Sequence, residues 1–183
     1  MNLSFPLPSL SSIIVVFLVL NSFDYGVNGD IVSDFCKNAS TRDPQLKYDF
    51  CVASLSANPA SKNAHDLLEL GIISMQICLQ NATSIHSYIA QILKDGKGEL
   101  AAKPCLEDCL DLYEDALDSI PNAMQYFKAK DYSSSNIQMS AAMDASVTCE
   151  DVFKEFDLTS PLTKQDGDFF QLTAISLTIT NMV

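Results

Sequence analysis

Acidic side chains recur along one segment of the chain in a pattern that could bind a cationic partner. Asp111, Asp115 and Asp118 follow one another at steps of four and three residues, which places them on one face of a helix. Like charges at this spacing repel one another, so a partner with basic groups would relieve the repulsion and associate faster. The alternative interpretation is an acidic face that contacts only solvent.

Two further polar residues lie beside a cysteine that could brace them. Thr148 and Asp151 flank Cys149 on the side away from the apolar positions of their helix. A disulfide at Cys149 would hold this flank rigid, and a rigid surface loses less conformational entropy on binding. The predicted partner-binding residues are therefore Asp111, Asp115, Asp118, Thr148 and Asp151.

Residue types that carry catalysis are sparse. His65 and His86 are the two histidines, they lie far apart in sequence, and no nucleophile motif accompanies them. His86 falls among apolar positions, which predicts a hydrogen-bonded core histidine. The sequence has no Trp, no His-Glu-x-x-His, no phosphate-binding glycine loop and no Cys-x-x-Cys. We predict that the protein is not an enzyme and has no cofactor, metal or small-molecule substrate.

The N-terminal residues have the pattern of an export signal. Leu10 to Leu20 is an apolar run that is too short to span a bilayer. Val27 and Gly29 are small residues before a cleavage site, so we predict a signal peptide at residues 1–29 and a mature domain at residues 30–183. A cut near Ser22 is the alternative. The formal net charge of −12 disfavours binding to nucleic acid or to an anionic membrane.

Six cysteines in an exported chain indicate disulfides. Cys36 and Cys51 lie on either side of a proline turn that can bring two antiparallel pieces together. Cys109 and Cys149 fall on apolar positions of two neighbouring helices. We therefore predict two bonds, Cys36–Cys51 and Cys109–Cys149.

The remaining cysteines, Cys78 and Cys105, lie at different heights along antiparallel helices. At 1.5 Å of rise per residue the difference is about 16 Å, which a disulfide cannot span. We predict that both are free and buried, with a bond between them as the alternative.

Apolar spacing and proline or glycine punctuation predict an all-α fold, with a disulfide-stapled helical hairpin at residues 30–58 before an antiparallel up-down-up-down four-helix bundle at residues 64–183. We expect Pro121 to kink or restart the second long helix and Asp131 to cap the third. The predicted bounds are 64–93 for the first long helix, a turn at 94–98, 132–156 for the third helix and a start near Pro161 for the last.

The apolar spacing also predicts which positions of the four long helices are in the core. In the first helix they are Leu68, Ile72, Met75, Leu79, Ala82, His86, Ile89 and Leu93, and in the second they are Leu106, Cys109, Tyr113, Ala116, Ile120, Ala123 and Phe127. In the third helix they are Met139, Ala142, Ser146, Cys149, Phe153 and Phe156, and in the last they are Phe169, Leu172, Ile175, Ile179 and Met182.

Two sequons, at Asn38 and Asn81, predict N-glycosylation in an exported protein. Asn81 adjoins a core position, so its access to the modifying enzyme is the less favoured of the two.

Several segments share the pattern of one plant protein family. They are Tyr48-Asp-Phe-Cys51-Val-Ala-Ser-Leu55, Asp66-Leu-Leu-Glu-Leu-Gly71, Asp115-Ala-Leu-Asp-Ser-Ile120, Lys130-Asp-Tyr-Ser-Ser-Ser-Asn136, Ser140-Ala-Ala142, Thr148-Cys-Glu-Asp151 and Gln171-Leu-Thr-Ala-Ile-Ser-Leu177. Over essentially the whole mature chain the sequence resembles the plant invertase and pectin methylesterase inhibitor family. The last segment is similar to plane-tree pollen allergens described as invertase inhibitors.

The resemblance implies a helical hairpin on a four-helix bundle, with one disulfide in the hairpin and one between the second and third bundle helices. It also implies that the acidic positions of the second bundle helix and the threonine of the Thr-Cys-Glu-Asp segment face the substrate cleft of an esterase. Carried over, these are the five residues named above. Such a protein is expected in the apoplast or cell wall, with the vacuole as the alternative.

The target is predicted from one loop. Invertase inhibitors present a Pro-Lys-Phe motif before the third helix, where this chain has Ala129-Lys-Asp-Tyr132. The difference favours non-covalent inhibition of pectin methylesterase. The alternatives are inhibition of an acid invertase and a secreted bundle without an enzyme target, such as a pollen allergen.

Overall fold

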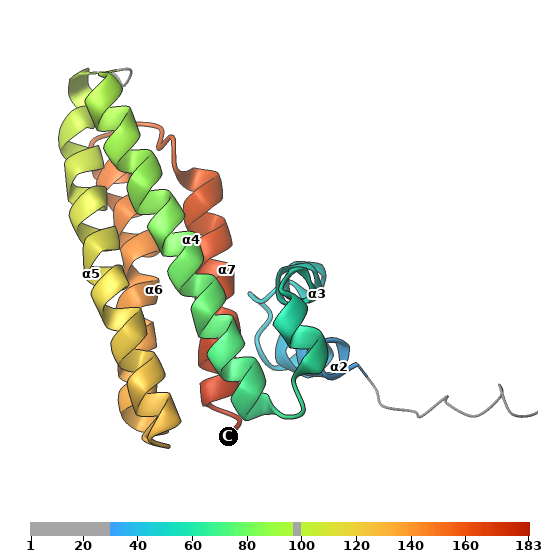
Figure 1. The fold of residues 1–183 in the computed structure, drawn as a ribbon. Helices are drawn as coiled ribbons and strands as arrows, with labels where there is room; N and C mark the ends of the chain where they lie inside the picture. Colours follow the sequence, from blue (N-terminus) through green and yellow to red (C-terminus); the bar gives the residue numbers. More distant parts are fainter. Residues whose placement is uncertain (1–29, 97–99) are drawn as a thin grey trace, which may run out of the picture.

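The computed structural model describes residues 30–96 and 100–183, and every regular element in these ranges is helical. The expected signal peptide and the expected turn residues Lys97 and Gly98 lie outside the described residues. A helical hairpin precedes a bundle of four long antiparallel helices, which confirms the predicted fold class (Figure 1). The elements are α2 (Ile31–Arg42), α3 (Tyr48–Ala57), η1 (Pro59–Asn63), α4 (Leu67–Asp95), η2 (Leu100–Ala102), α5 (Lys103–Lys128), α6 (Tyr132–Glu155) and α7 (Thr163–Thr180).

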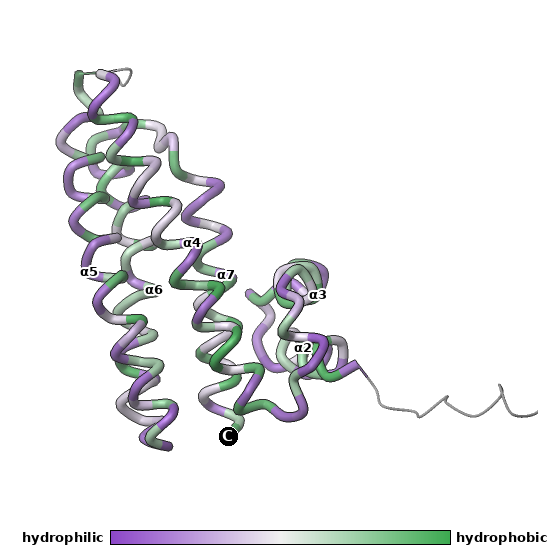
Figure 2. Tube along the Cα trace, in the orientation of Figure 1, coloured by the Kyte–Doolittle hydropathy of each residue, from purple (hydrophilic) through white to green (hydrophobic). Residues whose placement is uncertain are grey.

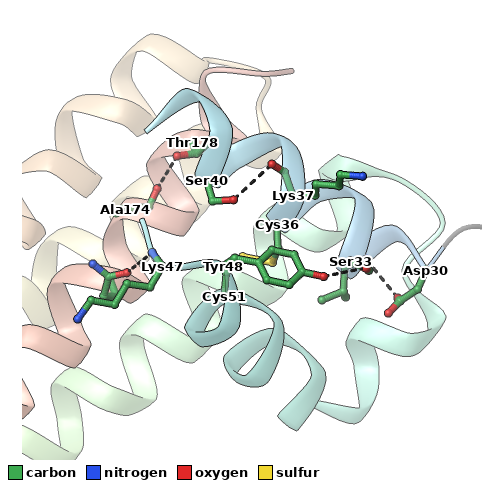
Figure 3. The surroundings of a disulfide bond; sticks show 12 residues. Asp30, Ser33, Cys36, Lys37, Ser40, Lys47, Tyr48, Cys51, Ala174 and Thr178 are labelled. Carbon is green, nitrogen blue, oxygen red and sulfur yellow. Dashed lines mark hydrogen bonds between the residues drawn. A yellow bond between two sulfur atoms is a disulfide. The ribbon is translucent and has the colours of Figure 1, made fainter. Parts of the chain in front are cut away.

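The hairpin is closed by the predicted disulfide between Cys36 and Cys51, whose Cα atoms are 5.7 Å apart. Figure 3 shows this bond between α2 and α3, with the Tyr48 hydroxyl directed at Ser33; the two oxygens are 3.3 Å apart. The hairpin packs beside α7 and α4 through α3. The side chain of Gln171 on α7 fixes it there through two hydrogen bonds of 2.8 Å to backbone groups of the turn between α2 and α3.

The second bundle helix, α5, follows the predicted apolar pattern throughout. All seven predicted positions are buried, while the acidic residues lie on the opposite face. The helix does not restart at Pro121, because one missing backbone donor leaves the flanking hydrogen bonds and the burial of Ile120 and Ala123 intact. Figure 2 shows hydrophobic and hydrophilic residues interleaved along α5.

The predicted core positions of α4 are wrong in part. Met75, Ala82 and Ile89 are buried, but Leu68 is exposed. Ile72, Leu79, His86 and Leu93 are only partly buried, and Leu70, Ile73, Cys78 and Ile85 are buried instead. The reason is that α4 contacts α5, α7 and the hairpin, so apolar residues surround much of its circumference and several spacings fit equally well.

Helix α4 also approaches its neighbours closely at Gly71. A Cβ atom built at this position would lie 2.6 Å from Cζ of Phe127 on α5 and 3.1 Å from Cγ2 of Ile179 on α7. Because both neighbouring side chains are buried, the absence of a Gly71 side chain lets three helices meet here.

The connections at both ends of α6 are tight. Asp131 caps α6 as predicted, accepting a hydrogen bond of 3.1 Å from the Ser134 amide. Helices α5 and α6 each end with a non-glycine residue in the left-handed conformation, Lys130 (φ 62°) and Asp157 (φ 55°). At the first turn the Asp131 amide donates to the Tyr126 carbonyl, five residues back, which is the Schellman arrangement.

Two core predictions at the ends of the last two helices, Phe156 and Met182, are corrected, whereas the last helix starts near Pro161 as predicted. Phe156 is 62% exposed because it is the C-cap of α6, where the chain leaves the helix and no core surface remains to cover the ring. The last helix begins at Thr163, two residues after Pro161. Its other predicted core positions are buried, apart from Met182, which lies beyond the helix end and is partly buried.

Helix α7 differs from α5 in carrying many polar side chains into the core. The buried polar residues of α7 are Asp166, Gln171, Thr173, Ser176 and Thr180. Ser176 donates a hydrogen bond of 2.9 Å to Ser74 on α4, and its oxygen lies 3.4 Å from the Cys78 sulfur. Hydrogen bonds therefore contribute much of the specificity with which α7 docks on the bundle.

Candidate functional site

The acidic residues of α5 form one exposed surface. Asp111, Asp115 and Asp118 are all exposed, on the side of the helix opposite its buried positions. The described neighbouring cation, Lys103, pairs with Glu107 at 3.4 Å rather than with any of the three. The surface can therefore offer negative charge to a partner.

The disulfide between Cys109 and Cys149 fixes the buried side of α5 against α6, at the level of Asp111. The Cα atoms of the two cysteines are 5.0 Å apart, and the pairing is the one predicted. Thr148 and Asp151 flank Cys149 and are both exposed. Because Asp111 follows Cys109 by two residues, the α5 and α6 portions of the site begin at the same level of the bundle.

We call the five predicted residues the acidic α5–α6 surface: Asp111, Asp115, Asp118, Thr148 and Asp151. All five are exposed on two neighbouring, covalently joined helices. They are the candidates for contact with a partner.

The structure adds residues to this surface that the sequence analysis did not select. Ile137, Ala141 and Asp144 are exposed and continue the line of Thr148 and Asp151 along α6 at steps of four and three residues. Ile137 is 64% exposed, and because α5 and α6 are antiparallel it lies toward the level of Asp118 and beyond. The periodicity was available in the sequence, but apolar residues at such positions are ordinarily assigned to the core.

Lys154 on α6 contacts Asp151 of the acidic α5–α6 surface and also lines a neighbouring cleft. Its ammonium donates a hydrogen bond of 2.8 Å to Oδ1 of Asp151. The same side chain lines a cleft of about 280 Å³ between α6 and α7, together with Glu150 and Asp166. The hydrogen bond and the charge of Asp151 raise the pKa of Lys154, so the ammonium form is favoured.

A polar cluster joins side chains of α5, α6 and α7. Asp166 on α7 is 2% exposed, and its Oδ1 accepts a hydrogen bond of 2.5 Å from the Tyr113 hydroxyl of α5. Glu150 on α6 accepts a hydrogen bond of 3.1 Å from Thr163 through Oε2. The second oxygen of each carboxyl group, Oδ2 of Asp166 and Oε1 of Glu150, is buried without a hydrogen-bond partner.

Burial dominates the electrostatics of this cluster. It raises the pKa of Asp166 to about 8; the Tyr113 hydrogen bond acts in the opposite direction, and the neighbouring Glu150 raises the value further. The pKa of Tyr113 is also raised, first by burial and then by the charge of Asp166. A pKa of about 8 keeps Asp166 protonated in mildly acidic solution, and the sequence analysis did not select this residue.

The other candidate residues lie apart from this surface. His65 is exposed and His86 is partly buried, so the prediction of a core histidine at 86 is wrong; Ile85 occupies the core position instead.

Within residues 30–96 and 100–183, no group of three His, Cys, Asp or Glu side chains is arranged to hold a metal ion. No helix in these ranges has the length and apolar character that crossing a membrane requires.

The two free cysteines are both buried, whereas the two sequon asparagines differ in exposure. Cys78 and Cys105 are both unpaired and buried, as predicted, and burial raises the pKa of Cys78 to about 12. Asn38 is exposed on α2, whereas Asn81 is only partly exposed and its Oδ1 is buried without a partner. Glycosylation at these two positions stays a prediction.

Comparisons with known proteins agree on one family. The model of the plant invertase/pectin methylesterase inhibitor family matches residues 30–179. A protein of Platanus acerifolia described as "Putative invertase inhibitor" is 47% identical over 96% of this chain and 97% of its own length. Pectinesterase inhibitor 12 of Arabidopsis thaliana is 38% identical over 95% of this chain and 98% of its own length. The crystal structure of a mutant form of an Arabidopsis pectin methylesterase inhibitor superimposes with a TM-score of 0.67 at 25% identity, covering 79% of this chain and 96% of that chain.

Proposed function

The chain belongs to the plant invertase/pectin methylesterase inhibitor family, and on this premise we propose that it is a secreted inhibitor of a pectin methylesterase. The family is one of inhibitors, and its members act through protein partners. The proposed mechanism is a non-covalent complex in which the acidic α5–α6 surface covers the polysaccharide cleft of the esterase. The chain itself turns over no substrate, and it acts after removal of its signal peptide, in the apoplast or cell wall.

The observation that carries this proposal is the exposed acidic surface on a helix pair joined by a disulfide. Its charges would attract a basic partner over a distance set by the ionic strength, which speeds the encounter. The rigid connection between α5 and α6 would reduce the entropy lost on binding. The names of the pectinesterase inhibitors among the relatives support the same target.

An acid invertase is the second candidate target. The observation in its favour is that two Platanus proteins, 47% and 49% identical to this chain, carry the invertase-inhibitor description. Against it stands the turn at Lys130 and Asp131, which lacks the Pro-Lys-Phe sequence that the resemblance associates with that target.

Titration of both enzymes with the disulfide-bonded mature chain tests the proposal. We expect stoichiometric loss of pectin methylesterase activity and unchanged invertase activity. The reverse result would assign the invertase, and loss of neither activity at micromolar concentration would favour a protein without an enzyme target.

A charge-matched pair of variants tests the surface. The triple variant D111N/D115N/D118N should weaken esterase binding by about tenfold to a hundredfold, chiefly through slower association at low salt. The control D34N/D49N/D168N removes the same number of charges from the hairpin and α7. Equal inhibition by both variants would show that the partner does not contact the acidic α5–α6 surface.

A further inference from the structure

Two carboxyl groups line the same cleft, and each has one buried oxygen without a donor. These oxygens are Oδ2 of Asp166 on α7 and Oε1 of Glu150 on α6. Their partner oxygens are already used, by the Tyr113 hydroxyl and by the Thr163 hydroxyl. A buried acceptor without a donor is costly, and this cleft has two of them.

One proton would satisfy both oxygens at once. A protonated Asp166 can donate through Oδ2 to Oε1 of Glu150, whereas two carboxylates would repel each other in a poorly solvated position. Glu150 and Asp166 line the same cleft, and the neighbouring Glu150 raises the pKa of Asp166. We propose that Asp166 and Glu150 share one proton, and that this proton bridge positions Thr148 and Asp151 on the acidic α5–α6 surface.

The charged and titratable groups around the bridge come from three helices. Tyr113 of α5 donates to Asp166, and Lys154 of α6 lines the same cleft. On α7, Lys164 forms an ion pair of 2.5 Å with Asp168 rather than with the two carboxyl groups of the bridge. Among the described residues that line the cleft, Lys154 is the cation, and it already donates to Asp151.

The bridge can influence the surface because Glu150 lies between Cys149 and Asp151 in the chain. Loss of the shared proton to solvent leaves two carboxylates that push α6 and α7 apart at this level. It also strengthens the attraction of Lys154 toward Glu150 at the expense of Asp151. Glu150 and Asp166 thus act as positioning residues for Thr148 and Asp151, and the docking surface is ordered in acid and loosened as the pH rises.

This regulation of the docking surface rests on the proposed inhibitory function, but the bridge itself can be tested without the esterase. Asp166→Asn keeps the size of the side chain, accepts from Tyr113 and donates permanently to Glu150. Glu150→Gln is the complementary variant, which donates to Asp166 from the other side. Asp168→Asn on α7 is the matched control, since it makes the same chemical change outside the cleft.

The first measurement is unfolding by denaturant between about pH 5 and pH 7.5, using the mature chain with both disulfides formed. In the wild type and the D168N variant, the unfolding equilibrium constant should rise by at least about tenfold over this range, because the native state binds a proton that the unfolded state has lost. In the D166N variant the rise should be absent. A parallel rise in the D166N variant and the wild type would overturn the proposal.

Two spectroscopic readouts distinguish positioning from simple stabilisation. The infrared carbonyl band of a protonated carboxyl group should be present in the wild type at about pH 6 and absent from both the D166N and E150Q variants. The amide resonances of Thr148 and Asp151 should shift with pH in the wild type and stay constant in the D166N variant. If the D166N variant does not fold, the E150Q variant carries the same comparison.

The last measurement joins the bridge to inhibition. Between about pH 5 and pH 7.5 the wild type should lose at least about tenfold more affinity for the esterase than the D166N variant does. Because both proteins are measured against the same esterase, any pH response of the esterase itself cancels in this comparison. Equal losses would show that the bridge does not position the surface. If no esterase is inhibited at any pH, the proposed function fails, while unfolding and spectroscopy still decide whether the proton is shared.

Discussion

The bundle has two halves that are held together by different chemistry. Helices α5 and α6 meet through buried apolar side chains and the disulfide between Cys109 and Cys149. Helix α7 adds hydrogen-bonded polar groups to its apolar packing: Ser176 bonds to Ser74 of α4, and Asp166, whose protonation depends on pH, bonds to Tyr113 of α5.

The two parts of the bundle are expected to differ in how strongly their stability depends on pH. Apolar packing and a covalent bond respond little to pH, so they suit a pair of helices that must present a fixed surface. A neutral carboxylic acid in the core makes the opposite half sensitive to the acidity of the surroundings. The surface is therefore built on the insensitive half, and its flank is adjusted from the sensitive one.

Removal of the covalent bond should break this contrast with the largest effect. The double variant C109A/C149A is expected to lose about 4 kcal/mol of unfolding free energy, because the bond closes a long loop in the unfolded chain. Denaturant titration measures the loss. The double variant C36A/C51A, which opens a shorter loop in the hairpin, should lose about 3 kcal/mol. A larger loss from the hairpin variant would show that the hairpin, rather than the α5–α6 pair, is the covalently stabilised unit.

Gly71 tests the point where the two halves meet. Gly71→Ala should cost about 2 kcal/mol of unfolding free energy, since the new methyl group would overlap the ring of Phe127 and contact Ile179. Gly167→Ala on α7 is the control, because nothing lies within 4 Å of its added Cβ and it should gain stability from better helix propensity. A loss at both positions would show that the cost does not come from the close packing at Gly71, because the added methyl group at Gly167 meets no neighbour.

Tyr113 connects the apolar half to the pH-sensitive half, and its removal should have the smallest effect. Tyr113→Phe deletes the donor to Oδ1 of Asp166 and should cost about 1 kcal/mol at mildly acidic pH. That hydrogen bond lowers the pKa of Asp166, so its loss raises the pKa further.

The pH dependence of unfolding gives the second readout for this variant. An aspartic acid with a raised pKa in the folded state stabilises the protein in acid, and the contribution is lost as the pH rises from the ordinary aspartate value through about 8. In the Y113F variant the decline should continue to higher pH than in the wild type. A decline that ends at lower pH would mean that Tyr113 stabilises the protonated form.

How far the sequence predicted the structure depends on how polar each helix is outside the core. On α5, charged residues separate the buried positions so clearly that all seven were found, from Leu106 to Phe127. On α4, apolar residues such as Leu68 and Ile72 compete with the buried positions at Leu70 and Ile73. Periodicity cannot choose between them when a helix has three neighbours.

The candidate site divides in the same way. Exposure of the five predicted residues followed from their spacing and from the adjoining cysteines. Asp166 was missed because aspartate is seldom buried, and only its place three residues before Phe169, on the apolar line of α7, could have indicated otherwise. Its relation to Glu150 depends on how α6 and α7 lie together, which no local pattern in either helix encodes.

The tight turn at Lys130 and the disulfide at Cys109 and Cys149 together make a closed ring from this part of the chain, because the bond joins residues 40 apart in sequence. A protease that cuts the peptide after Lys128 or Lys130, both exposed, would open the ring without dividing the molecule. Both fragments would stay linked through sulfur, so the nicked chain would retain both helices of the acidic α5–α6 surface.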